Sequence, residues 1–278
     1  MGIALKKIYG PGPRMQRVEN HTLDGDPSGN VNVRILLPHE NPNAVIVYFH
    51  GGGWVTGSID EFDTFGRKLA AATKAAVVLV NYRKAPEHPY PIAVNDAWTA
   101  LTWTAARLAK IGGPDVPLVV AGDSAGGNLA AVLTQRARDT AGAPPIALQV
   151  LAYPVTDSNL NRASYADPEN QLLVDRQSMV WFWDHYLKQA NRRFHPEASP
   201  LRARSFQNLP PAIILTAEHD VLRDEGEAYV RRLTDAGVLV RHRRFDGQMH
   251  GFFTFVNILP GSDAGINYVA ANLRELVC

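Results

Sequence analysis

Short runs of apolar, often β-branched residues alternate with longer amphipathic segments along the chain. The runs typical of strands are 31–38, 43–50, 75–82, 117–124, 146–155, 211–220 and 238–245. The segments typical of helices are 62–74, 93–112, 126–140, 176–190 and 223–237. The central strand runs are almost continuously apolar, as expected for parallel strands covered on both faces. The pattern therefore predicts a doubly wound, mostly parallel α/β sheet of about eight strands with helices on both faces.

The region 159–210 interrupts this alternation, because it carries a helix pattern at 176–190 but no strand pattern. An insertion at this place is either a surface decoration or a helical cap over a site at the strand ends. One stripe of its helix holds four large apolar side chains: Met179, Phe182, Trp183 and Tyr186. The simple interpretation of this stripe is a packing face, whereas Trp181 points away from it. We interpret residues 1–278 as one domain carrying this insertion.

Composition narrows the function classes. The 278 residues include 28 Lys+Arg and 27 Asp+Glu, a formal net charge of +1, so no basic field favours nucleic acid. The length suffices to bury a large core, and a small, roughly neutral partner fits the charge balance. The chain has one cysteine and therefore no internal disulfide, which suits a reducing cytoplasm.

We also expect no membrane anchor. Few apolar residues precede Lys6 and Lys7, and Lys6 stands where a myristoylation signal needs Ser or Thr. Cys278 is terminal, so a prenylation motif is absent as well. No apolar run approaches the roughly 20 residues that span a bilayer.

A nucleophile candidate lies where a predicted strand meets a predicted helix, in the sequence Gly122-Asp123-Ser124-Ala125-Gly126. In a nucleophile elbow the serine occupies a strained turn, and side chains two positions away would collide with neighbouring backbone. The alternative is a glycine-rich phosphate cradle. However, the stretch lacks both the P-loop ending and the spacing of a dinucleotide fingerprint.

A serine nucleophile needs a base and an orienting carboxylate, which follow it along the chain in this fold. The histidines after Ser124 are His185, His195, His219, His242 and His250. His250 is preferred because it occupies a glycine-flanked loop just after the last strand. Glu218 and Asp220 both remain candidates for the acid, with a slight preference for the shorter Asp220.

Two further acids, Asp224 and Glu225, are expected in the first turn of the next helix, where they complement its dipole.

Three consecutive glycines, Gly51 to Gly53, end the strand at 43–50. Acyl transfer develops an oxyanion, and amides about 3 Å from it lower the barrier by several kcal/mol. The glycine loop therefore predicts oxyanion-hole backbone that acts together with the amide of Ala125. His50 is expected to hold this loop rather than to transfer protons.

These motifs resemble the hormone-sensitive-lipase-like carboxylesterases of the α/β-hydrolase fold, from about Val31 onward. The matching stretches are HGGGW, NYRKAPEHPYPIAVND, GDSAGGNLA, LAYPVTD, HDVLRDEG and DGQMHGF. The resemblance implies a triad of Ser124, Asp220 and His250, and it selects Asp220 over Glu218. It implies an oxyanion hole formed by Gly52, Gly53 and Ala125. It also implies hydrolysis of short- to medium-chain carboxylic esters through an acyl-enzyme, without a metal or cofactor.

The chain departs from the family pattern in three places. Val221 replaces the usual proline after the acid and could loosen its loop, and Lys84 replaces a usual leucine. The cap segment before HGGGW, about residues 1–25, is shorter than usual. We therefore expect a more open pocket that is built largely from the insertion.

Six residues are expected to bind the substrate: Trp54, Leu172, Leu173, Met179, Trp183 and Phe252. By resemblance, a homodimer through the edge near the last strand is also expected.

Two other functions compete with ester hydrolysis. One is amide hydrolysis of the formamidase or deacetylase type on the same triad. The other is ligand binding without turnover, as in a plant hormone receptor that resembles the family but lacks the triad histidine, which His250 argues against. A peptidase is less favoured, since no propeller or other gating domain accompanies the core.

Overall fold

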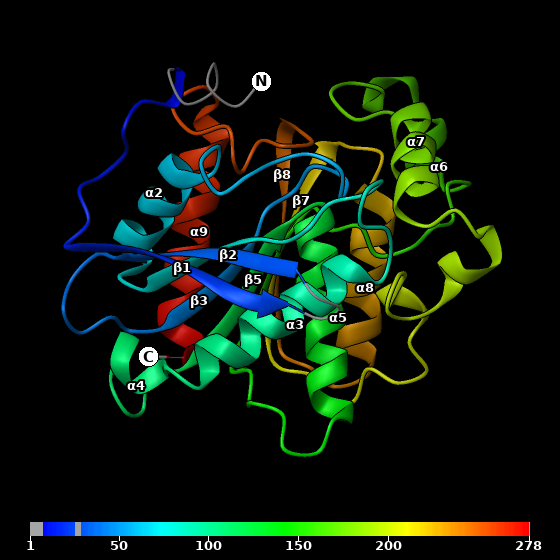
Figure 1. Ribbon diagram of the computed structural model, residues 1–278. Helices are drawn as coiled ribbons and strands as arrows, with labels where there is room; N and C mark the ends of the chain where they lie inside the picture. Colours follow the sequence, from blue (N-terminus) through cyan, green and yellow to red (C-terminus); the bar gives the residue numbers. More distant parts are fainter. Residues whose placement is uncertain (1–7, 26–28, 278) are drawn as a thin grey trace.

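An eight-stranded sheet crosses the molecule in the order β1-β2-β4-β3-β5-β6-β7-β8 (Figure 1). The computed structural model describes residues 8–25 and 29–277, so Lys6, Lys7 and Cys278 lie outside the described residues. β1 pairs antiparallel with β2, and β2 pairs antiparallel with β4. All the remaining neighbours pair in parallel. The predicted mostly parallel α/β sheet is therefore confirmed.

The strands are β1 Arg17–Gly25, β2 Gly29–Leu37, β3 Val45–Phe49, β4 Ala76–Asn81, β5 Leu118–Asp123, β6 Leu148–Ala152, β7 Ala212–His219 and β8 Val240–Met249. The α-helices are α2 Asp63–Thr73, α3 Ile92–Ala105, α4 Leu108–Ile111, α5 Ala125–Asp139, α6 Ala163–Ala166, α7 Arg176–Tyr186, α8 Arg223–Asp235 and α9 Pro260–Val277. Three short 3-10 helices are η1 Pro168–Asn170, η2 Ala190–Phe194 and η3 Pro200–Arg202.

Two of the longer elements, β1 and α9, were not predicted from the sequence pattern. β1 has a largely polar sequence in which only Leu23 is buried, because it pairs with β2 alone at the edge of the sheet. β1 is formed by Arg17–Gly25, which were expected to belong to the N-terminal cap segment. Residues 1–7 of that segment lie outside the described residues. α9 packs beside α2, and its buried Ile266, Val269 and Leu273 recur at helical spacing.

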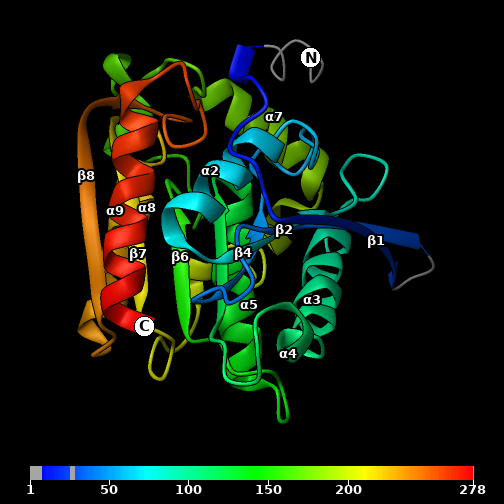
Figure 2. The same cartoon turned by 90° about the vertical axis from the view of Figure 1, so that its left-hand side faces the viewer.

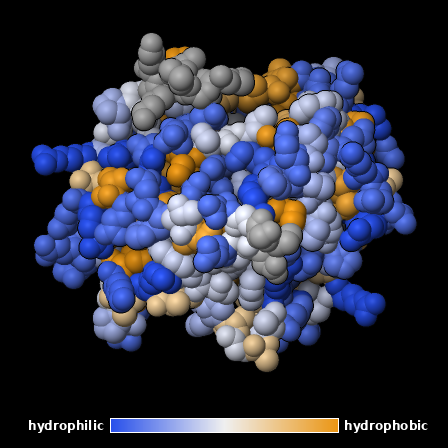
Figure 3. Space-filling model, in the orientation of Figure 1, coloured by the Kyte–Doolittle hydropathy of each residue, from blue (hydrophilic) through white to orange (hydrophobic). Residues whose placement is uncertain are grey.

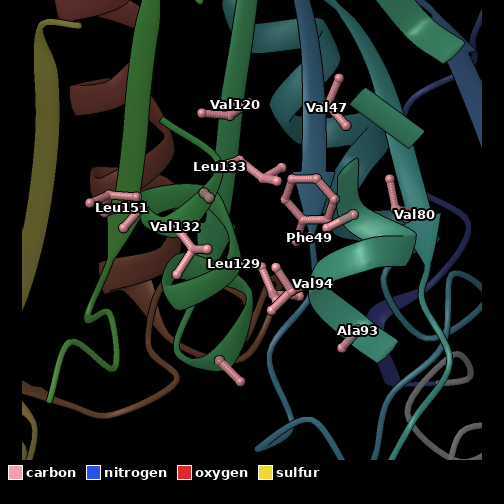
Figure 4. Packing of buried hydrophobic residues seen from close by; sticks show 14 of the residues in the cluster. Val47, Phe49, Val80, Ala93, Val94, Val120, Leu129, Val132, Leu133 and Leu151 are labelled. Atoms are coloured by element: carbon pink, nitrogen blue, oxygen red, sulfur yellow. The ribbon is translucent and has the colours of Figure 1, made fainter. Parts of the chain in front are cut away.

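The alternating side chains of the strands build two hydrophobic cores, one on each face of the sheet. Val47 and Phe49 of β3 pack on the face covered by α3 and α5 (Figure 4). Ile46 and Tyr48 of the same strand belong to the core on the opposite face, together with residues of α2 and α9. Figure 2 shows these two helices on one side of the sheet. Burying each such side chain contributes roughly 1.5–3 kcal/mol. Both faces of the sheet are therefore covered.

The insertion folds as a helical cap formed by α6, η1, α7, η2 and η3, with α6 and α7 at the upper right of Figure 1. Asp157 fixes the base of this cap, since the buried Asp157 carboxylate pairs with Arg162 at 2.8 Å and with Arg202 at 2.6 Å.

The molecular face in Figure 3 is largely hydrophilic with scattered apolar patches. Within the described ranges, no helix has the length and apolarity needed to cross a bilayer.

Candidate active site

Ser124 lies in the sharp turn between β5 and α5 with φ 53° and ψ −118°, outside the regions that most residues adopt. The turn is possible because of the glycines on either side. A Cβ atom on Gly126 would lie 1.9 Å from the carbonyl oxygen of Phe49, and one on Gly122 would lie 2.3 Å from the Gly126 backbone. The local sequence therefore places the Ser124 hydroxyl at the carboxyl edge of the sheet.

His250 links Ser124 to Asp220. Its Nε2 atom lies 3.0 Å from Ser124 Oγ, and its Nδ1 atom lies 2.8 Å from Asp220 Oδ2. Because the carboxylate accepts only from an N–H, the proton sits on Nδ1 and leaves Nε2 able to accept from the serine hydroxyl. Asp220 is fully buried, and its other oxygen accepts from the Leu222 N–H at 2.9 Å.

Glu218, the alternative acid, is turned away from His250. Its carboxylate accepts from the Gly247 N–H at 2.7 Å and so fixes β8 beside β7. Of the two acids that the residue pattern leaves open, the structure brings only Asp220 to the histidine.

Each of the three glycines in the loop after β3 is required by a different close contact. A Cβ atom on Gly51 would lie 2.4 Å from the Asp123 carboxylate, and one on Gly52 would lie 2.4 Å from the Thr56 carbonyl. A Cβ atom on Gly53 would lie 2.1 Å from the ring of Phe182 in the cap helix α7. Gly52 and Gly53 also have positive φ angles of 108° and 60°, which side chains disfavour.

The loop leaves backbone donors unused beside Ser124. In the described part of the chain, the N–H groups of Gly52, Gly53 and Ala125 donate to no protein acceptor. Gly52 and Gly53 line the same cavity as Ser124, and Ala125 begins α5, whose dipole is positive at this end. Such donors are what a developing oxyanion requires.

Asp123 ties the glycine loop to the serine turn, a role that the sequence motifs do not indicate. Its Oδ1 atom accepts from the Gly51 N–H at 2.9 Å and from the Tyr48 hydroxyl at 2.8 Å. Burial raises the pKa of Asp123 to about 6, and the two hydrogen bonds oppose this shift. The sequence feature that could have indicated this role is the position of Asp123, a carboxylate at the end of an otherwise apolar strand.

His50 supports the glycine loop through its side chain and its backbone. Its Nδ1 atom donates to the Gly51 carbonyl at 2.7 Å, while its own carbonyl accepts from the Tyr82 hydroxyl at 2.8 Å. The ring stacks on Tyr82 and Phe62. Burial lowers the pKa of His50 to about 3, so the ring stays neutral near pH 7. This placement agrees with the expected supporting role.

A cavity of about 550 Å³ opens above Ser124 and His250. Leu173 and Met179 line it, as expected. Four of the expected substrate-binding residues are absent from its wall: Trp54, Leu172, Trp183 and Phe252. Residues that the sequence reasoning missed take their place, among them Tyr9, Phe62, Phe65, Val155, Phe182 and Phe255.

The four expected residues that do not line the cavity lie elsewhere for clear physical reasons. Trp54 is fully buried and stacks on Tyr186 with ring centroids 4.0 Å apart, and Trp183 belongs to the same aromatic cluster. Phe252 is buried against Phe245 on the opposite core. Leu172 is 51% exposed and points outward. Large apolar side chains near the site thus serve packing as well as binding.

The expectation that the pocket is built largely from the insertion is wrong. The cap supplies only Leu173, Val174, Ser178, Met179 and Phe182, and the other lining residues come from outside it. Tyr9 is one of these, and its carbonyl is held by the Asn257 side-chain amide. The cavity is not sealed.

The acid loop is anchored to the cap despite Val221. This residue is fully buried, and its carbonyl accepts from the Ser164 hydroxyl at 2.6 Å. Asp224 and Glu225 lie in the first turn of α8, as predicted. Glu225 does more than complement the dipole, since its buried carboxylate accepts from the Thr156 N–H at 2.8 Å and from the Tyr165 hydroxyl at 3.0 Å.

Within residues 8–25 and 29–277, no group of three or more His, Cys, Asp or Glu side chains is arranged to hold a metal ion.

Comparison with known proteins identifies the class. A profile of the alpha/beta hydrolase fold matches residues 46–254. The chain is 39% identical over 251 residues to the carboxylesterase NlhH of Mycobacterium tuberculosis, covering 88% of this chain and 78% of that relative. It is 36% identical over 243 residues to an ethyl acetate hydrolase of Pseudomonas putida, with 86% and 76% covered.

A solved structure agrees with these relatives. A hyperthermophilic esterase from Pyrobaculum calidifontis superposes with a TM-score of 0.91 at 37% identity, covering 99% of this chain and 87% of that one. The protein is thus a carboxylic ester hydrolase of the alpha/beta hydrolase fold. Within that fold, the chain belongs to the hormone-sensitive-lipase-like carboxylesterase family.

Proposed function

We propose that this chain is a serine carboxylesterase in which Ser124 is the nucleophile, His250 the general base and Asp220 the orienting acid. The observation that carries the proposal is the hydrogen-bonded series from Ser124 Oγ through the His250 ring to Asp220, with distances of 3.0 and 2.8 Å. The buried carboxylate stabilises the imidazolium that forms when the serine loses its proton.

The reaction proceeds in two halves. Ser124 Oγ attacks the ester carbonyl while His250 Nε2 takes the hydroxyl proton, and the oxyanion forms beside the N–H groups of Gly52, Gly53 and Ala125. His250 then protonates the alcohol as the carbon–oxygen bond breaks, which leaves an acyl-serine. Water, deprotonated by the same ring, releases the acid and restores Ser124.

Short- to medium-chain esters suit the cavity. Its wall is mainly apolar, and about 550 Å³ holds a small ester and its alcohol group. The relative named as an ethyl acetate hydrolase supports the short end of this range.

Hydrolysis of p-nitrophenyl esters from acetate to laurate, beside matched anilides and the Ser124→Ala variant, tests the proposal. Turnover of short esters that Ser124→Ala abolishes is the expected result. Faster cleavage of anilides would instead indicate an amide hydrolase. A folded protein that cleaves neither series would indicate a ligand-binding relative.

We also propose that the chain forms a homodimer in the cytoplasm. Among the described residues, β8 is the last strand of the sheet and pairs with β7 alone, so its outer edge is available for pairing with a second copy. The single cysteine suits a reducing compartment. Analytical ultracentrifugation of the wild type and of a Val240→Pro variant tests the dimer, which the proline should weaken.

A further inference from the structure

The cavity above Ser124 contains a carboxylate that the proposed mechanism does not use. Glu61 and Asp123 are its two charged lining residues, and no Lys or Arg is among the described residues of its wall. Asp123 is already engaged by Tyr48 and Gly51. In the described ranges, the Glu61 carboxylate has neither a hydrogen bond nor an ion pair, although its backbone N–H donates to Ser58.

Lys84, whose pKa is affected by Glu61, lies outside the cavity wall. Its ammonium donates to Asn81 Oδ1 at 3.1 Å and to the Tyr82 carbonyl at 3.0 Å. Burial lowers the pKa of Lys84, while Glu61 acts in the opposite direction. Lys84 therefore interacts electrostatically with Glu61 but does not line the cavity.

The charge of Glu61 also acts on the cavity interior. Burial, together with the nearby carboxylates of Asp123 and Glu61, raises the pKa of Tyr9 to about 12. Tyr9 lies in the cavity wall and therefore keeps its phenolic proton at neutral pH. The negative charge of Glu61 thus reaches a residue that faces the substrate space.

Aromatic rings complete the surroundings of this carboxylate. Five of them line the cavity: Tyr9, Phe62, Phe65, Phe182 and Phe255. The faces of such rings attract organic cations, and apolar walls accept the methyl groups of a substituted ammonium. A carboxylate without an ion pair, several aromatic rings and no cationic side chain match the chemistry of an organic cation.

We propose that the cavity prefers esters that carry an organic ammonium group over neutral esters of the same shape, with Glu61 as the specificity-determining residue. This inference rests on the proposed esterase function, because the cavity must first admit an ester to Ser124. Anionic esters, such as half-esters of dicarboxylic acids, should be the poorest substrates because Glu61 and Asp123 repel them.

Charge can be varied at constant shape in either half of the ester. Acetylcholine is compared with its carbon isostere 3,3-dimethylbutyl acetate, and the ethyl ester of γ-trimethylaminobutyrate is compared with its own carbon isostere. For at least one pair, the wild type should show a kcat/KM about three- to tenfold higher for the cation. Added salt should reduce this ratio, because the cavity is open to solvent.

Two variants assign the effect. Glu61→Gln should bring the ratio of cationic to neutral kcat/KM close to one. Asp60→Asn is the matched control, since the neighbouring Asp60 side chain is 68% exposed, pairs with Arg34 and is absent from the cavity wall. This control should keep the wild-type ratio.

The outcomes separate the two proposals. If p-nitrophenyl acetate is hydrolysed but neither pair shows a charge preference, or if Glu61→Gln keeps the preference, the role of Glu61 is wrong and the esterase proposal stands. If no ester is hydrolysed, saturation-transfer NMR with choline and 3,3-dimethylbutanol still decides the matter. A choline signal that Glu61→Gln removes supports the cation site, and equal signals in both proteins contradict it.

Discussion

The carboxylate of Asp123 accepts the N–H of Gly51 at 2.9 Å, which joins the residue before Ser124 to the first glycine of the oxyanion loop. The contact bridges the ends of two adjacent parallel strands, β5 and β3. It is so close that a Cβ atom on Gly51 would lie 2.4 Å from Asp123 Oδ2. The nucleophile and the loop amides are thus held in a fixed position relative to each other, as a preorganised oxyanion hole requires.

Substitution of Asp123 should reveal this linkage. Asp123→Asn keeps an oxygen that can accept from both Gly51 and Tyr48, and we expect kcat within about fivefold of wild type. Asp123→Ala removes both bonds and releases the loop, so kcat should fall on the order of 100-fold with a smaller change in KM. Steady-state kinetics on p-nitrophenyl acetate measures both, with circular dichroism as the control for folding. Full activity in the Ala variant would show that the loop holds its position without Asp123.

The contact between Gly53 and Phe182 gives a second prediction. Gly53→Ala places a methyl group into the Phe182 ring at a backbone φ of 60°, so we expect the loop to shift and kcat/KM to fall at least about tenfold. Phe182→Ala combined with Gly53→Ala removes the collision but not the backbone strain. The double variant should therefore regain part of the activity. No recovery would mean that strain alone causes the loss.

A third prediction separates residues of the cavity wall from residues of the packing core. Met179→Ala widens the cavity, so the optimum in a p-nitrophenyl ester series should move to longer acyl chains. Trp183→Phe acts in a fully buried aromatic cluster beside Trp54 and should lower stability while leaving the chain-length optimum in place. Urea unfolding and the ester series are measured on both variants. A shifted optimum in Trp183→Phe would place that ring in the binding site after all.

Much of this architecture can be predicted from the sequence because its determinants are local. The glycines beside Ser124 and in the loop after β3 identify backbone positions where a Cβ atom cannot fit. The order of Ser124, Asp220 and His250 along the chain follows the order of the strands that carry them. Periodicity recovers seven of the strands but misses β1, whose alternation is weak because it buries a single residue.

The substrate cavity could not be predicted in the same way. Its wall combines residues distant in sequence, such as Tyr9, Glu61 and Phe255, whose proximity arises only from tertiary packing. Trp54 and Trp183 are large aromatic residues of the kind that often line a binding site, yet they pack against each other in the core. The acid shows the same limit, since the local pattern left Glu218 and Asp220 open. The family resemblance selected Asp220, and the structure brings that carboxylate to His250.

Glu225 makes a final prediction about stability and pH. Burial raises its pKa from 4.5 to about 8 in the folded state, although the Thr156 and Asp157 N–H groups oppose the shift. Between these values the folded protein holds a proton that the unfolded chain has lost. The stabilising contribution is therefore complete below about pH 4.5 and is lost as the pH rises through about 8.

Replacing Glu225 with Gln should remove this dependence, because the amide keeps an oxygen for the backbone donors and carries no charge. Between about pH 5 and pH 8, the free energy of unfolding of the wild type should fall by about 3–4 kcal/mol more than that of Glu225→Gln. Urea denaturation at several pH values measures the difference. Glu227→Gln, on the same helix but paired with Arg244, should keep the wild-type slope. Parallel curves for wild type and Glu225→Gln would show that Glu225 is ionised in the fold, so the cap would be anchored by a buried charge rather than by a neutral acid.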